Sequence, residues 1–177
     1  MELGKLMRRI IVLAGALLAA QVHAEGMTVM VQAGYSGESE MAGLGLRLSP
    51  FWTTRWGGFN VAAHPEFQIN RHHERHSEPG SDALWQAGGT AMLRAVYGEH
   101  GMRPYVELGL GLNYLNRTEL GSNEYSTRFQ FGEHLGAGIE TRNGWFGGWR
   151  FSHYSNGGLR SPNNGLNAHQ VVLGTRF

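Results

Sequence analysis

The amino-acid sequence predicts an all-β protein, an eight-stranded antiparallel transmembrane β-barrel. Three observations lead to this prediction. Apolar and polar residues alternate with period two from residue 27 to the end of the chain, the polar positions carry many charges, and short connections alternate with longer ones. Alternation is typical of strands with one apolar face. A polar opposite face and connections of unequal length are typical of barrels in bacterial outer membranes.

The alternation is clearest in the third segment, which covers residues 58–71. Its odd positions from Phe59 to Ile69 are apolar, whereas most even positions from Asn60 to Asn70 are polar. In a strand these two sets of side chains point to opposite faces. Eight segments of this kind cover residues 27–35, 41–48, 58–71, 83–97, 103–114, 128–142, 145–155 and 167–177.

The polar faces of these segments carry more charge than the dry core of a soluble sandwich would accept. They include Arg47, His64, Glu66, Arg94, Glu107, Arg150 and Arg176. A barrel can pack such residues in its interior, and it must be closed because lipid cannot bond to a free strand edge. Eight strands enclose an interior that side chains fill. We therefore expect no pore, and we expect the function on the loops or the outer wall.

The connections between segments fall into two classes. Short ones cover residues 49–57, 98–102 and 142–144, and longer or more polar ones cover residues 36–40, 72–82, 115–127 and 156–166. Short periplasmic turns and longer outer loops are the pattern of outer-membrane barrels. The final stretch from Val171 to Phe177 alternates and ends in an aromatic residue, as does the insertion signal of bacterial outer-membrane proteins.

The first 24 residues predict a secretory signal peptide. Lys5, Arg8 and Arg9 precede an apolar run over residues 10–20, and Ala24 offers a small residue for cleavage. Residues 25–177 then form the barrel, and the expected location is the bacterial outer membrane. The chain has no cysteine and a formal charge of +1, so neither a thiolate metal site nor a nucleic-acid partner is expected.

A His-x-Ser pair ends the seventh segment. The odd positions from Trp145 onward are mostly aromatic and belong in lipid, so His153 and Ser155 should face lipid as well, about 6.5–7 Å apart along the strand. Asn167 projects beside the same edge from the last segment. A serine beside an imidazole that a third group orients is the arrangement of a nucleophile. On spacing alone, a girdle histidine and a loop-edge serine at the headgroup boundary explain the pattern better.

The stretch His153–Asn167, which reads HYSNGGLRSPNNGLN, resembles the C-terminal motif of the PagL family of lipid A 3-O-deacylases. The resemblance implies an eight-stranded barrel that hydrolyses the ester-linked acyl chain at position 3 of lipid A without a metal or other cofactor. It also implies that His153 is the general base and Ser155 the nucleophile. Asn156 and Asn163 match family asparagines, to which we assign oxyanion stabilisation and loop shaping.

One position departs from the family pattern, which has glutamate where this chain has Asn167. An amide can fix the imidazole tautomer but cannot stabilise imidazolium with a full charge. Glu133 is the alternative acid. It stands opposite His153 if residues 142–144 form a three-residue hairpin loop with Gly144 left-handed, whereas a two-residue turn would place His134 there. We favour the longer loop, because it also turns apolar residues toward lipid. A girdle carboxylate paired with a cation is the other interpretation of Glu133.

Other histidines and arginines are candidates for binding contacts rather than for catalysis. The cluster over residues 71–76 fits no standard metal spacing, so we interpret its histidines as solvated loop residues. Together with Arg117 and Arg128 they are candidates for contact with lipid A phosphates. The expected partners are lipid A or lipopolysaccharide, outer-membrane lipid and, as a homodimer, a second copy of the chain. Two other functions stay open: a non-catalytic barrel that binds lipopolysaccharide or mediates adhesion, and a lipid A acyltransferase.

Overall fold

The computed structural model describes residues 26–37, 39–75 and 83–177. The signal peptide predicted over residues 1–24 lies outside these ranges, as does His76. Within them, no helix is long and apolar enough to cross a membrane.

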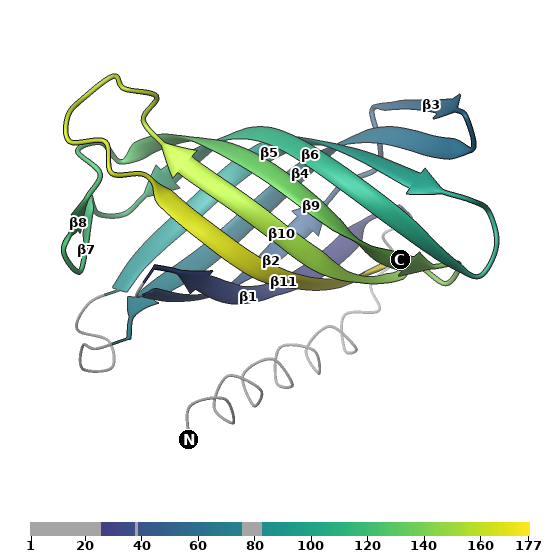
Figure 1. Ribbon diagram of the computed structural model, residues 1–177, viewed down its shortest axis with the longest axis horizontal. Coiled ribbons are helices and arrows are strands. Elements are labelled where there is room, and N and C mark those ends of the chain that lie inside the picture. Colours follow the sequence, from purple (N-terminus) through teal and green to yellow (C-terminus); the bar gives the residue numbers. More distant parts are fainter. Residues whose placement is uncertain (1–25, 38, 76–82) are drawn as a thin grey trace.

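Eight long antiparallel strands form a closed barrel, which confirms the predicted fold class (Figure 1). In order around the barrel they are β2 (Ser39–Arg47), β1 (Thr28–Ser36), β11 (Leu166–Arg176), β10 (Trp145–Ser155), β9 (Phe129–Thr141), β6 (Met102–Leu115), β5 (Ala83–Tyr97) and β4 (Phe59–Glu74). The first strand pairs with the last, and pairing between β2 and β4 closes the circle. Closure leaves these strands without a free edge, as a lipid environment requires.

Three short strands lie in segments that the sequence assigned to connections. β3 (Trp52–Trp56) pairs with the beginning of β4, and the loop between β6 and β9 holds β7 (Glu119–Leu120) paired with β8 (Asn123–Glu124). β3 exists because β4 is much longer than β2. The register of β2 reaches β4 only from Glu66 onward, so β3 supplies the backbone partners of residues 59–63.

The interior is packed with buried charged side chains. Arg150 is fully buried, and its guanidinium lies 2.5 Å from a carboxylate oxygen of Glu66 and 2.7 Å from one of Glu107. Arg47 contacts the same two glutamates at 2.8 and 2.9 Å, and Arg94 lies 3.2 Å from Glu107. Each charge has opposite charges beside it, which is the condition under which burial is tolerated. This layer fills the middle of the barrel.

The outer wall carries the apolar half of the alternation. Leu108, Leu110 and Val171 are 56%, 71% and 56% exposed, and the five tryptophans are exposed too. A largely apolar surface around a closed barrel suits contact with lipid chains. The loops 116–128 and 156–165 lie at one end of the barrel, here called the loop end. The turns 98–101 and 142–144 lie at the other, the short-turn end, together with the chain's C-terminus (Figure 1).

Candidate active site

His153 lies near the loop end of β10, and it is paired with one residue on each of the two adjoining strands. It is paired with Asn167 of β11 and with Glu133 of β9. Its Nδ1 atom lies 2.6 Å from Oδ1 of Asn167. A carbonyl oxygen only accepts hydrogen bonds, so Nδ1 carries a proton, and in the neutral ring Nε2 then has the lone pair. This is the tautomer that a general base needs.

The hairpin between β9 and β10 sets the position of Glu133. Gly144 has φ +86°, and its N–H donates to the carbonyl of Thr141 at 3.1 Å. The loop therefore has three residues, as predicted, and Glu133 stands opposite His153, whereas His134 points inward and is buried. Glu133 is exposed. No described residue forms a hydrogen bond or ion pair with it, so the structure does not support the girdle pair with a cation.

Ser155 is the last residue of β10 and shares the outward row of His153. Along this strand Ser152 and Tyr154 are buried, whereas His153 and Ser155 are half-buried. Between the side chains of His153 and Ser155 no hydrogen bond forms in the described structure. Alternate residues of a strand lie about 6.5–7 Å apart. Catalytic hydrogen bonds are often long in a free enzyme and tighten when substrate is present, so the spacing is compatible with a serine–histidine pair.

The loop that follows Ser155 is organised by two asparagines. Asn156 is 1% exposed; its Nδ2 donates to the carbonyl of Arg160 at 2.9 Å, and its Oδ1 accepts from the Gly158 N–H at 2.9 Å. The Asn156 N–H donates to Oδ1 of Asn163 at 3.1 Å. This bond orients the side-chain amide of the exposed Asn163. Nδ2 of Asn163 has no acceptor among the described residues. The two asparagines therefore differ: Asn156 shapes the loop, and Asn163 retains an unused donor.

Gly165 ends this loop against the His153 ring, a contact that the sequence analysis missed. Its φ is +56°, and a Cβ atom at this position would lie 3.0 Å from Cε1 of His153 and 3.7 Å from Nδ1. Glycine is therefore favoured here both by the backbone conformation and by the close approach. The only sequence signal was a glycine two residues before Asn167.

An apolar groove of about 640 Å³ runs along the outer wall from His153 and Glu133. Its other lining residues come from β5, β6, β9 and β10, and they are Ala91, Leu93, Leu108, Gly109, Leu110, His134, Leu135 and Phe151. The polar pair lies within this otherwise apolar lining. Such a surface can hold a hydrocarbon chain beside an imidazole.

A second serine–histidine pair lies inside the barrel. Ser152 Oγ is 2.8 Å from Nδ1 of His134, and it also accepts a hydrogen bond from Gln170 at 2.9 Å. These three residues are buried. Ser152 and His134 are within hydrogen-bond distance of each other, whereas Ser155 and His153 are not. A lipid substrate cannot reach the buried pair, however, so accessibility favours Ser155 and His153 as the catalytic pair.

The histidine-rich segment is only partly a loop, which corrects the prediction. β4 continues to Glu74, so His72 points inward, is fully buried and has its Nε2 2.9 Å from Oε1 of Gln86. In the part of the chain that the structure describes, no group of three or more histidines and carboxylates could hold a metal. Arg128 is exposed beside the Tyr114 hydroxyl, at 3.3 Å, and Arg117 lies in the loop between β6 and β7.

Known proteins resemble this chain in sequence and in fold. A family profile described as lipid A 3-O-deacylase (PagL) matches residues 40–176. The lipid A deacylase PagL of Bordetella bronchiseptica is 35% identical over 94 residues, which are 53% of this chain and 51% of that protein. The lipid A deacylase PagL of Pseudomonas aeruginosa is 33% identical over 70 residues, or 40% of each chain. The chain thus spans about half the length of these relatives or less.

A solved structure extends the likeness to the fold. The crystal structure of the outer membrane enzyme PagL superposes with a TM-score of 0.77 at 19% identity, covering 85% of this chain and 99% of that one. At this identity the likeness concerns the barrel architecture. The family profile covers most of the barrel, including every residue of the site described above. The chain belongs to the lipid A 3-O-deacylase (PagL) family.

Proposed function

We propose that this protein is an outer-membrane hydrolase that removes the ester-linked 3-hydroxyacyl chain at position 3 of lipid A. The observation that carries the proposal is the half-buried His153, which Asn167 fixes with Nε2 free, on the apolar wall two residues before Ser155. Membership of the lipid A 3-O-deacylase family and the names of the two relatives support the same activity.

The proposed orientation places the loop end outside the cell. Outer-membrane barrels have their longer loops outside and their short turns in the periplasm. His153 and Ser155 then lie near the outer leaflet, which contains lipopolysaccharide. Their position on the wall, rather than in the lumen, lets an acyl ester reach them without leaving the membrane.

The first step is acyl transfer to serine. Nε2 of His153 takes the proton of the Ser155 hydroxyl while Oγ attacks the carbonyl carbon of the ester. The carbonyl becomes an oxyanion, which accepts a hydrogen bond from Nδ2 of Asn163. One such donor contributes about 3–4 kcal/mol to the transition state. The intermediate collapses, the bond to the sugar oxygen breaks, and that oxygen takes the proton from His153.

The second step frees the enzyme. His153 takes a proton from a water molecule, and the resulting hydroxide attacks the acyl-serine carbonyl. Collapse of this second intermediate returns the proton to Ser155 Oγ and releases a 3-hydroxy fatty acid. Asn167 keeps the imidazole in one tautomer throughout, since its Oδ1 accepts from Nδ1–H.

The groove beside His153 supplies the site for the hydrocarbon chain. Its floor and walls are leucine, alanine and phenylalanine side chains, so a chain that leaves the ester carbonyl can lie along it. Binding there holds the ester close to Ser155, and such positioning converts a bimolecular encounter into a local one.

The test is mass spectrometry of lipid A from cells that produce the wild-type protein, Ser155→Ala or Ser152→Ala. Wild type and Ser152→Ala should remove one 3-hydroxyacyl mass, whereas Ser155→Ala should leave lipid A intact. Ser152 is the matched control because it touches a histidine inside the lumen. A gained acyl mass would indicate an acyltransferase, and unmodified lipid A with folded wild-type protein would indicate a non-catalytic barrel. Heat-dependent migration in gels checks folding of each variant.

A further inference from the structure

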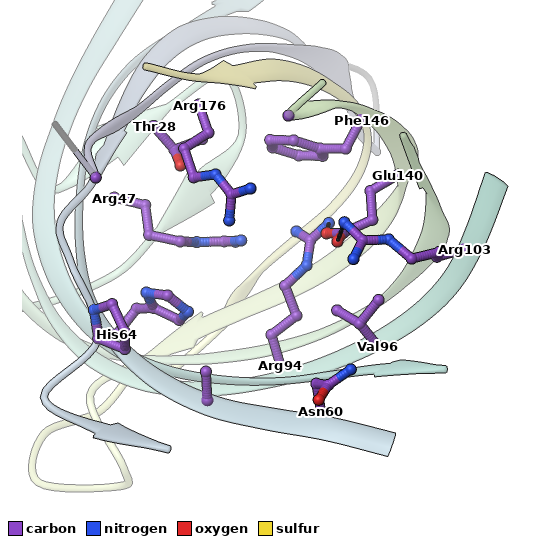
Figure 2. Close-up of a pocket in the computed structure, with 14 residues that line it drawn as sticks. Thr28, Arg47, Asn60, His64, Arg94, Val96, Arg103, Glu140, Phe146 and Arg176 are labelled. Carbon is purple, nitrogen blue, oxygen red and sulfur yellow. Dashed lines mark hydrogen bonds and ion pairs between the residues drawn. The ribbon is translucent and has the colours of Figure 1, made fainter. Parts of the chain in front are cut away.

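A cavity of about 310 Å³ opens at the short-turn end of the barrel, far from His153. Four arginines of its lining come from four different strands: Arg47, Arg94, Arg103 and Arg176. Figure 2 shows their side chains directed toward the middle of the cavity, with Glu140 the one acid among the described lining residues. The site is separate from the proposed active site, and the inference below takes from the proposed function only the orientation of the barrel.

Ion pairs around this cavity leave positive charge without compensation. The connected network joins four arginines to three glutamates, namely Arg47, Arg94, Arg103, Arg150, Glu66, Glu107 and Glu140. Arg176 forms no ion pair within the described ranges. The network therefore has an excess of one positive charge, and the exposed Arg176 of the cavity lining adds a second. The buried charges of the network interact more strongly than they would in water.

Aromatic rings hold one of these guanidiniums in place. The Arg94 guanidinium lies 3.4 Å from the centre of the Tyr105 ring and 4.5 Å from that of Phe146. Arg94 is only 4% exposed, yet its Nε–H has no hydrogen-bond partner, and neither has the buried Nε–H of Arg103. Buried donors without partners are rare in native proteins. Both of these donors belong to arginines that line one cationic cavity. They indicate that a ligand with hydrogen-bond acceptors binds in this cavity.

We propose that this cavity binds a phosphate group, carried either by inorganic phosphate or by a lipid with a phosphate monoester headgroup. The planar fork of arginine matches the oxygens of phosphate, and several forks from different strands can surround one group. A phosphate dianion neutralises the excess of two charges, whereas a carboxylate neutralises one. In the proposed orientation the cavity opens to the periplasm and borders the inner leaflet, where both forms of the ligand are accessible.

The experiment follows arginine Nε–H signals by NMR on the ¹⁵N-labelled full-length barrel in a phosphate-free detergent. Titration with inorganic phosphate at constant ionic strength should shift the signals of Arg94, Arg103 and Arg176 in a saturable way. The signal of Arg142, which lies in the turn at the same end but outside the cavity, should stay in place. Arg176→Gln should weaken binding about fivefold or more, because it removes a charge-assisted contact. Arg142→Gln is the matched control and should bind as the wild type does.

A second titration identifies the source of the phosphate group. Short-chain phosphatidic acid carries a phosphate monoester, and short-chain phosphatidylcholine carries none. Saturable shifts with inorganic phosphate support a site for the free ion, and shifts with phosphatidic acid alone support a headgroup site. The proposal is overturned if neither ligand gives saturable shifts, if phosphatidylcholine shifts the same signals, or if Arg176→Gln and Arg142→Gln weaken binding equally.

Discussion

Nδ1 of His153 lies 2.6 Å from Oδ1 of Asn167, directly across the pairing of β10 with β11. The family pattern has glutamate at this position, whereas this chain has a neutral amide whose oxygen lies against the imidazole. The amide fixes the ring and its tautomer. In the proposed mechanism, the amide adds no negative charge beside the imidazolium that forms when Ser155 is deprotonated.

Asn167 should therefore position the base without fully stabilising its charged form. Asn167→Ala removes the acceptor of Nδ1–H, so the kcat for release of 3-hydroxy fatty acid should fall about tenfold or more. Asn167→Glu adds the missing charge and should raise kcat above that of the wild type. Quantifying the released fatty acid from purified lipid A checks both. An Asn167→Ala variant with unchanged kcat would show that the 2.6 Å contact is not used in catalysis.

Glu133 should contribute less than Asn167 does. It stands across from His153 but has no hydrogen bond or ion pair with any described residue, so only a screened attraction to the imidazolium remains. We expect Glu133→Gln to keep kcat within about threefold of the wild type, the range of a weak exposed charge interaction. A loss larger than that of Asn167→Ala, in the same fatty-acid assay, would instead identify Glu133 as the acid of the triad.

Asn163 offers a way to separate oxyanion stabilisation from loop shaping. Asn163→Asp keeps an oxygen that can accept the Asn156 N–H but loses the Nδ2–H donor. Its kcat should fall by about 10²–10³-fold, the usual cost of one oxyanion donor, while its unfolding temperature stays near that of the wild type. If Asn163→Asp is as active as the wild type and only Asn163→Ala is impaired, the residue has a structural role alone.

Gly165 should be intolerant of a side chain because of the His153 ring. Gly165→Ala places a methyl group 3.0 Å from Cε1 of His153, so the ring must shift from its present position and activity should drop about tenfold. Gly158→Ala is the matched control: Gly158 lies in the same loop with φ +79°, and its added Cβ meets nothing within 4 Å. Both variants have a strained backbone, so equal losses of activity in the deacylation assay would contradict the steric explanation.

The buried charge layer should dominate the effect of single substitutions on stability. Arg150→Met leaves Glu66 and Glu107 buried with one fewer cation between them, and breaking such a pair costs about 3–5 kcal/mol. Arg55→Met removes the exposed ion pair with Glu99 and should cost at most about 1 kcal/mol. Urea unfolding in lipid vesicles, followed by tryptophan fluorescence, measures both. Similar values for the two variants would refute a structural role for the interior network.

Period-two alternation predicts the strands, but soluble sandwiches alternate as well. The charged polar faces and the unequal connections are needed to predict a membrane barrel. The register of β9 against β10 follows from the three-residue loop, which is favoured over a two-residue turn because it directs apolar residues to lipid; this loop places Glu133 opposite His153. Strand ends were less certain. The polar residues at the end of β4 look like a loop, yet His72 is buried because the barrel interior accepts polar side chains.

Contacts between distant segments could not be obtained from the sequence. The approach of Gly165 to His153 and the bond from Asn156 to Asn163 depend on how the loop between β10 and β11 folds back on itself. The cavity with Arg94 and Arg176 requires the closed shape of the barrel, since its lining comes from strands that are far apart in the chain. Alternation assigns each of these residues to a face but does not say which of them meet.

The layer of Arg47, Arg94 and Arg150 with Glu66 and Glu107 has a consequence for traffic through the protein. It blocks the barrel axis, so no solute passes from one mouth to the other. In the proposed reaction, the fatty acid that is released at the outer wall therefore leaves sideways, into the leaflet that supplied the lipid. An anion held at the opposite mouth must leave by the opening through which it entered.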